Sequence, residues 1–280
     1  MLRFLPIYKQ RVWGGRKIGE HLYRTLPDGC IGESWDIVDR PENQSLVTQG
    51  PMAHLSLREI REQHADTVLG PDYPREKPFP ILVKWLDCRE RLSLQVHPTP
   101  QDPEGEPKTE FWYIAAAQPG AAVFAGLQAK VTRKQFQEAL HNNTIESLVP
   151  RLQVKAGNAL LVESGCPHAI DAGNLILEIQ QNSDTTYRVW DWDRLGLDGK
   201  PRELHTDRSL QAIDFHAETP VIQQSESEPD NTTLADCNWF RIRKKSLNAN
   251  CPSLSFQAGE QPRLLHVISG VLTGSLTFIF

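Results

Sequence analysis

The sequence of 280 residues has no long hydrophobic run. No window approaches the roughly 20 apolar residues that a membrane-spanning helix needs. The first 15 residues also lack the apolar segment and the small-residue cleavage site of a secretory signal. Basic residues are not in excess, since 30 Lys and Arg stand against 35 Asp and Glu, which disfavours nucleic acid as the main partner. The sequence therefore predicts a soluble protein that binds neither membranes nor nucleic acids.

Cysteine is scarce as well. The five cysteines are widely spaced, odd in number and without a CxxC pair. This pattern is typical of reduced thiols in the cytosol rather than of a disulfide framework. We therefore expect a cytoplasmic protein.

Short alternating segments dominate the rest of the chain, separated by turns rich in its 20 Pro and 18 Gly residues. The expected strands are residues 81–85, 92–97, 110–115, 159–163, 175–181 and 187–190. Many short strands with turns between them predict a barrel or a sandwich. The sequence thus indicates a mainly β protein.

Two segments have helical spacing of their apolar residues. Residues 56–69 are expected to form a helix that Ser56 caps, and residues 132–149 a helix that breaks near Asn142 and Asn143. We expect few helices beyond these two.

The C-terminal part reads differently. Residues 223–231 are polar and acidic, as in a linker, and strand-like segments follow at 239–243 and 264–280. Because an apolar strand at the end of the chain leaves an unpaired edge, we expect residues 272–280 to pair elsewhere in the fold or with a neighbouring subunit.

One strand carries an unusual polar face. In "RLSLQVHP", residues 91–98, alternation puts leucine and valine on one side and Ser93, Gln95 and His97 on the other. Surface strands normally present charged groups, whereas these are neutral hydrogen-bonding or metal-binding groups. If the apolar side packs against a second layer, this polar side faces the inside of a barrel.

Further polar residues follow in strands that are otherwise apolar or aromatic. Lys108 and Glu110 share one face of "KTEFWYI", and "SGCPHAI" presents His168 at the start of a strand. In "LILEIQQ", Glu178 points away from the apolar stripe, and Arg188 follows ten residues later. Together with the previous strand, these residues predict a metal centre inside the fold.

The donor set leaves the metal open. Two imidazoles with oxygen donors from Gln95 and Glu110 suit zinc, and two histidines with one carboxylate also suit iron(II). Composition alone does not choose between them.

These motifs resemble a known family. "VWGG", "GESWDIV", "LVKWLDCRERLSLQVHP", "KTEFWYI", "SGCPHAI" and "LEIQQNSDTTYRVWDWDR" occur in this order within residues 1–215. They are similar to the type I mannose-6-phosphate isomerases in their short bacterial form. The resemblance implies a cupin (double-stranded β-helix, or jelly-roll) barrel. It also implies a zinc-dependent aldose–ketose isomerase that interconverts mannose 6-phosphate and fructose 6-phosphate through a cis-enediol(ate).

The resemblance also implies roles for individual residues. The implied metal ligands are Gln95, His97, Glu110 and His168. The implied catalytic residues are Lys108, Glu178 and Arg188, and those near the sugar phosphate are Ser93 and Arg194. Glu178 is the candidate general base, although Lys108 or a metal-bound water can share that role. We expect one Zn²⁺ per chain, with other divalent ions also compatible, and a monomer or homodimer.

The expected domain organisation has three parts. Residues 1–220 form the catalytic cupin domain with a helical insert at 132–149, residues 221–235 a polar linker, and residues 236–280 a second, shortened β-domain. Two other functions use the same ligands: an iron(II) cupin oxygenase, and a sensor that binds a sugar phosphate without turnover. The oxygenase leaves Lys108 without a role. The sensor leaves Lys108, Glu178 and Arg188 without one.

Overall fold

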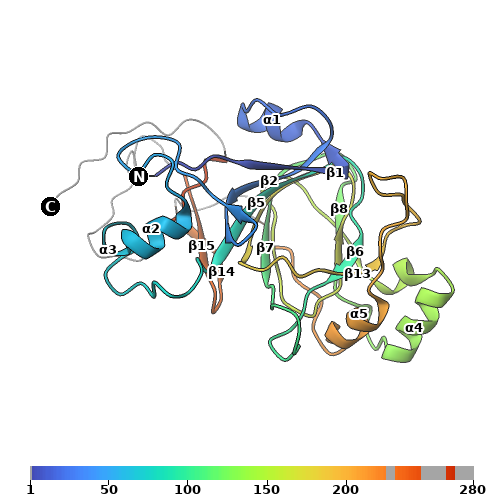
Figure 1. The fold of residues 1–280 in the computed structure, drawn as a ribbon. Coiled ribbons are helices and arrows are strands. Elements are labelled where there is room, and N and C mark those ends of the chain that lie inside the picture. Colours follow the sequence, from blue (N-terminus) through green and yellow to red (C-terminus); the bar gives the residue numbers. More distant parts are fainter. Residues whose placement is uncertain (1, 225–230, 247–262, 269–280) are drawn as a thin grey trace.

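The structure is a computed structural model that describes residues 2–224, 231–246 and 263–268. Two antiparallel sheets form its body (Figure 1). The larger sheet has the order β1-β2-β5-β12-β7-β10, with bounds Ile7–Gly15, Ile31–Ile37, Ile81–Cys88, Asn174–Gln181, Glu110–Ala117 and Ala159–Val162. The smaller sheet has the order β13-β6-β11-β8-β9, with bounds Tyr187–Trp190, Leu94–Val96, His168–Ile170, Ala122–Ala125 and Arg151–Gln153. The mainly β fold is confirmed, and the described strands pair within these sheets rather than in one closed barrel.

The core between the two sheets is apolar at one end. Leu86, Trp112 and Ile176 of the larger sheet pack with Val123 and Ile170 of the smaller one, and all are buried. These side chains alternate with residues of the outer face, as the two-residue period of a strand requires. The inner faces of the two sheets therefore enclose the space in which a site can form.

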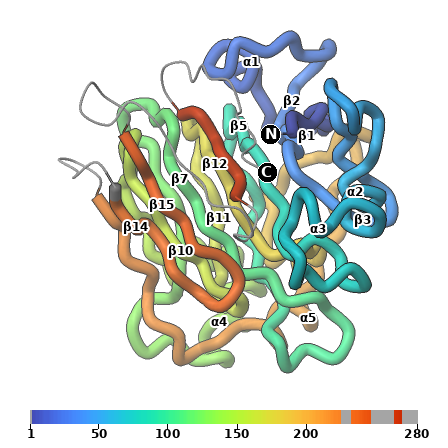
Figure 2. The backbone as a smooth tube through the Cα atoms, turned by 90° about the vertical axis from the view of Figure 1, so that its left-hand side faces the viewer, coloured from blue at the N-terminus to red at the C-terminus, as the bar shows by residue number. Residues whose placement is uncertain are grey.

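A hairpin covers the outer face of the larger sheet. Strands β14 (Asn231–Asp236) and β15 (Arg241–Lys245) pair with each other and lie across β7 and β10 (Figure 2). Leu234 and Ile242 pack there against Phe111 and Leu177. The hairpin thus covers the face of the larger sheet that points away from the smaller sheet.

Helices occupy the ends of the molecule (Figure 1). They are α1 (Lys17–Leu22), α2 (Leu57–Gln63), α3 (Ala65–Val68), α4 (Arg133–His141), the 3-10 helix η1 (Ile145–Leu148) and α5 (Thr206–Ala212). No helix in the described part is both long and apolar enough to span a bilayer. Apolar side chains of α4 and α5 pack with Leu94 and Val96 of β6, so the apolar side of that strand does face a second layer.

Both expected helices are found, with one difference. Ser56 caps α2 through a capping box with Glu59, but the segment divides at His64 into α2 and α3. The second segment breaks as expected, because Asn143 takes the left-handed conformation (φ 56°) between α4 and η1. Asparagine tolerates this conformation better than most residues.

The C-terminal expectations are met only in part. Strand β14 begins at Asn231, inside the range expected for a linker, and β15 starts at Arg241, two residues later than expected. Residues 264–268 form no regular strand, and residues 269–280 lie outside the described residues. The expected pairing of residues 272–280 therefore stays a prediction, as does the division into domains. A two-residue hairpin of β3 (Asp39–Arg40) and β4 (Asn43–Gln44) completes the fold.

Candidate metal centre and active site

Three of the expected ligands converge between the sheets. His97 follows β6, Glu110 opens β7 and His168 opens β11, so each stands at a strand end. The His97 Nε2 lies 3.1 Å from Glu110 Oε1, and His168 Nε2 lies 3.6 Å from Glu110 Oε2. All three side chains are buried, and their donor atoms lie within 4.8 Å of one another.

The two imidazoles are held in one tautomer. His97 Nδ1 donates to the carbonyl of Thr185 at 2.9 Å, and His168 Nδ1 donates to the carbonyl of Cys166 at 2.8 Å. Since a carbonyl oxygen only accepts, Nδ1 carries the proton and each Nε2 presents a lone pair. Burial lowers the pKa of His97 to about 3, and it also lowers the pKa of His168.

This arrangement fits a divalent cation. Both Nε2 atoms are buried without a hydrogen-bond partner and face the carboxylate of Glu110, so two imidazole lone pairs and a carboxylate converge on one point. Acceptors in such a place repel each other unless a positive ion lies among them. Two imidazoles and a carboxylate, each imidazole oriented by a backbone carbonyl, form the usual surroundings of zinc or iron(II).

Gln95, the fourth expected ligand, lies in the same row. It is directly opposite His168 on one neighbouring strand and opposite Arg188 on the other. Directly opposed residues of antiparallel strands project from the same face. The Gln95 amide therefore points to the side of the sheet on which His168 stands, and its role as a ligand stays a prediction.

Lys108 contacts the cluster of His97, Glu110 and His168 through Glu110. Its Nζ is 2.8 Å from Glu110 Oε1, and both side chains are buried. Burial opposes the charge of Lys108, but the attraction of Glu110 outweighs it and raises the pKa of Lys108. A protonated lysine is thus fixed at the edge of the metal centre.

Trp112 connects the triad to Glu178. Its Nε1 lies 3.2 Å from Glu110 Oε2 and 3.2 Å from Glu178 Oε2, donating to both carboxylates. Burial and the nearby charge of Glu110 raise the pKa of Glu178, although Lys84 and Lys108 oppose this. Glu178 is therefore a buried carboxyl group whose proton affinity is above normal, as acid–base catalysis requires.

Lys84 is a site residue that the sequence motifs did not indicate. Its Nζ lies 3.4 Å from Glu178 Oε1, and its side chain is buried. The cross-strand register puts Lys84 opposite Glu178, which fixes the pair geometrically. The available signal was a single charged residue inside the apolar strand "ILVKWLDC".

A chain of polar contacts continues from Lys84 to the edge of the larger sheet. Lys84 Nζ stands 5.1 Å from the centre of the Trp35 ring, and Trp35 Nε1 donates to Glu33 Oε2 at 2.6 Å. Arg11 forms a 2.8 Å ion pair with Glu33. Burial would raise the pKa of Glu33, but Arg11 and Lys84 lower it to about 2. Trp35 thus packs against Lys84, and Glu33 holds Trp35 in place.

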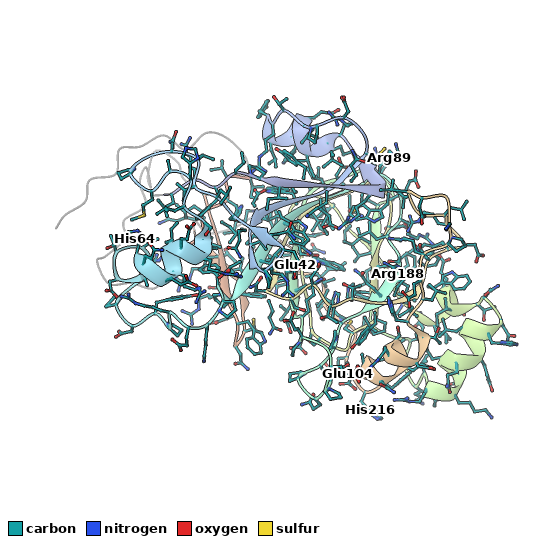
Figure 3. The ribbon with its side chains drawn as sticks, viewed as in Figure 1. Glu42, His64, Arg89, Glu104, Arg188 and His216 are labelled. Atoms are coloured by element: carbon teal, nitrogen blue, oxygen red, sulfur yellow. The ribbon has the colours of Figure 1, made fainter. Side chains whose placement is uncertain are left out.

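Arg188 projects from β13 (Figure 3). Its Nη1 donates to the carbonyl of Glu203 at 2.7 Å, while its backbone N–H donates to Nδ1 of His205 at 3.0 Å. Among the described residues, Arg188 forms no ion pair with Asp184 or Asp191, and the partners of Asp191 are Arg194 and Arg202.

Arg194 pairs with a buried carboxylate. It pairs with Asp191 at 2.7 Å rather than with the exposed Asp193. The turn after β13 explains this, because Trp192 and Asp193 both have positive φ and turn the chain back on itself. Ser93 is buried immediately before β6.

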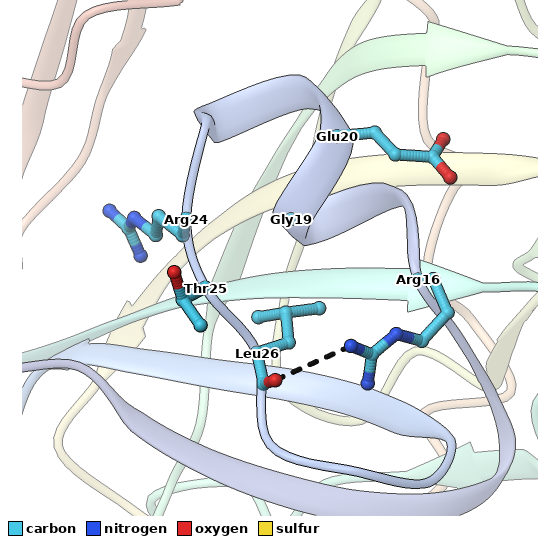
Figure 4. Close-up of a pocket in the computed structure, with 6 residues that line it drawn as sticks. All are labelled: Arg16, Gly19, Glu20, Arg24, Thr25 and Leu26. Atoms are coloured by element: carbon cyan, nitrogen blue, oxygen red, sulfur yellow. Dashed lines mark hydrogen bonds between the residues drawn. The ribbon is translucent and has the colours of Figure 1, made fainter.

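A pocket of about 410 Å³ lies elsewhere, against α1 (Figure 4). Arg16 lines it and donates through Nη2 to the carbonyl of Leu26 at 3.4 Å. None of the expected site residues lines this pocket.

Facing antiparallel sheets with a buried His-Glu-His cluster define a metal-binding cupin. A family model for the catalytic domain of type I phosphomannose isomerase matches residues 1–104. The mannose-6-phosphate isomerase ManA of Bacillus subtilis is 34% identical over 290 residues, covering 100% of this chain and 90% of the relative. That of Streptococcus mutans is 36% identical over 267 residues, covering 93% and 82%. The chain therefore belongs to the type I mannose-6-phosphate isomerase family.

Solved structures of mannose 6-phosphate isomerases are also similar to this chain. The crystal structure of mannose 6-phosphate isomerase from Bacillus subtilis matches with a TM-score of 0.80 and 34% identity, over 88% of this chain and 80% of that one. A mannose 6-phosphate isomerase bound with zinc and yttrium matches with a TM-score of 0.62 and 15% identity, over 87% and 82%. The second likeness concerns the fold alone.

Proposed function

We propose that this protein interconverts mannose 6-phosphate and fructose 6-phosphate through a cis-enediol(ate), with one Zn²⁺ per chain. The observation that carries the proposal is the buried His97-Glu110-His168 cluster, whose electron-pair donors face one another beside Lys108. Membership of the isomerase family supports the same reaction. The oxygenase and sensor alternatives have no observation of their own in their favour.

The ligands in this proposal are Gln95, His97, Glu110 and His168. A divalent ion held by these residues would supply a Lewis acid that polarises the sugar carbonyl and stabilises the negative charge developing on its oxygen. Other divalent ions are compatible with the same donors.

Protein groups supply the remaining chemistry. Glu178 takes the proton from the carbon next to the carbonyl and returns it to the neighbouring carbon. Trp112 donates to its Oε2, which leaves Oε1, beside Lys84, as the oxygen that receives the proton. Lys108, beside Glu110, and Arg188, opposite Gln95, are positive charges that orient the sugar oxygens. Each of these groups is held in place before the substrate arrives.

The phosphate end of the substrate is assigned to Ser93 and Arg194. We place the protein in the cytoplasm, where the reduced Cys30, Cys88, Cys166 and Cys237 are stable. Whether it acts as a monomer or a homodimer stays a prediction.

The test is the rate of conversion of fructose 6-phosphate to mannose 6-phosphate by the purified protein as isolated, after chelation, and after zinc is added back. We expect the rate to vanish with the chelator and return with zinc, while magnesium, the matched control, restores little. A folded, zinc-loaded sample without turnover would refute the proposal and favour the sensor. Restoration by iron(II) alone, with oxygen uptake, would favour the oxygenase.

A further inference from the structure

Two arginines pair with one buried carboxylate after β13, and a third arginine lies near them. Asp191 accepts from Arg194 Nη2 at 2.7 Å, from Arg202 Nε at 2.6 Å and from Arg202 Nη2 at 2.6 Å. Arg188 is the third member, since burial and the charge of Arg202 lower its pKa. We call Arg188, Arg194 and Arg202 the arginine cluster. Its positive charge exceeds what Asp191 alone neutralises.

The arginine cluster also has unused donors. Arg188 Nε and Arg194 Nε are buried without a hydrogen-bond partner. Asp191 occupies Nε and Nη2 of Arg202, so Nη1 is the group that this half-buried side chain offers to a ligand. Buried donors on charged groups are costly to leave unpaired, and the planar guanidinium matches the oxygens of a phosphate. The ligand chemistry indicated is a phosphate monoester dianion.

The backbone is bent to make this arrangement. Trp192 and Asp193 are consecutive residues with φ of 58° and 54°, a conformation that side chains disfavour. This turn brings Arg194 back onto Asp191. Trp192 Nε1 donates to the carbonyl of Leu92 at 2.7 Å. This bond ties the turn to the segment that carries Ser93, Gln95 and His97.

The arginine cluster lies beside the metal centre. Arg188, Gln95 and His168 are directly opposed on three adjacent strands and project from one face. Strands in a sheet are about 4.8 Å apart, so Arg188 stands about 10 Å from His168 along this row. An extended hexose phosphate has a comparable length, so one molecule can reach both places.

We propose that Arg202, held with Arg194 on Asp191, binds the phosphate group of the substrate and sets the preference for phosphorylated sugars. The inference rests on the proposed function, because it assigns the other end of the same substrate. It adds Arg202 as a binding residue and Asp191 as the residue that positions it.

The test compares Arg202→Gln and Arg202→Lys with the wild type, all zinc-loaded and full-length. Arg241→Gln is the matched control, because Arg241 pairs with Asp236 on the distant β14–β15 hairpin. With fructose 6-phosphate, Arg202→Gln should raise KM roughly 10- to 100-fold, the usual worth of one charged hydrogen-bonding group, with kcat changed far less. Arg202→Lys keeps the charge but loses the two-pronged contact, so its KM should fall in between.

Binding of inorganic phosphate, measured by calorimetry on the same samples, separates the phosphate role of Arg202 from the isomerase function. Affinity should fall by a similar factor in Arg202→Gln and stay unchanged in Arg241→Gln. If the wild type is active and both Arg202 variants keep its KM and phosphate affinity, the phosphate role of Arg202 is wrong and the isomerase stands. If the wild type binds phosphate through Arg202 but turns nothing over, the isomerase is wrong and the anion site stands. Circular dichroism confirms folding, and Arg202→Lys decides the matter if Arg202→Gln does not fold.

Discussion

Protonation of Glu33 should lower the free energy of unfolding in mild acid. The substitution Glu33→Gln should remove this pH-dependent contribution. The pKa of Glu33 falls from 4.5 to about 2 in the folded protein, where it contacts Arg11 and Trp35. A group with a lowered folded-state pKa stabilises the fold fully above its unfolded pKa, here 4.5, and loses that effect as the pH falls towards 2. This difference is worth about 3.4 kcal/mol at pH 7 and about 2.0 kcal/mol at pH 3.5.

Urea unfolding of wild type and Glu33→Gln, both with chelator so that metal loss does not contribute, measures this quantity. Glutamine keeps an oxygen for Trp35 and imitates the protonated acid. The gap in unfolding free energy should therefore be about 3 kcal/mol at pH 7 and narrow by about 1.4 kcal/mol at pH 3.5. Glu90→Gln is the control, because the exposed Glu90 carboxylate pairs with its exposed neighbour Arg89. A gap that does not change with pH would refute the reasoning.

Further substitutions test the site and the fold. His97→Ala and His168→Ala should each lose bound zinc and activity together, which metal analysis of the dialysed protein checks. Arg188→Ala should keep its zinc and lose most turnover, and a near-normal rate would remove Arg188 from the mechanism. Ser56→Ala removes the cap of α2 and should cost about 1 kcal/mol in urea unfolding. Gly14→Ala would place a Cβ 2.4 Å from the backbone of β2 and should cost about 1–3 kcal/mol in urea unfolding.

The clustering of His97, Glu110 and His168 was predictable because each lies in a recognisable local motif. Alternation alone separates Ser93, Gln95 and His97 from the apolar side of their strand, and the structure confirms that the apolar side packs against helices. The break near Asn143 and the cap at Ser56 are likewise local, since they depend on single side chains and their own backbone.

Features set by contacts between distant segments were not predictable in this way. Lys84 faces Glu178 only because β5 and β12 adopt one particular register, which no local pattern encodes. The partner of Arg194 depends on two left-handed residues, Trp192 and Asp193, that lack the glycine normally associated with such a turn. The start of β15 was misplaced because Trp239 and Phe240 look like strand residues but lie in the turn of the hairpin.

The carbonyls of Thr185 and Cys166 have a consequence for how this centre can change. They hold the two imidazoles through main-chain oxygens, which every amino acid possesses. Substitution at either position therefore leaves the acceptor in place, and only a displacement of the backbone removes it. The orientation of the two imidazoles is thus set by the fold, and we expect substitutions at Thr185 and Cys166 to be tolerated but those at His97 and His168 not to be.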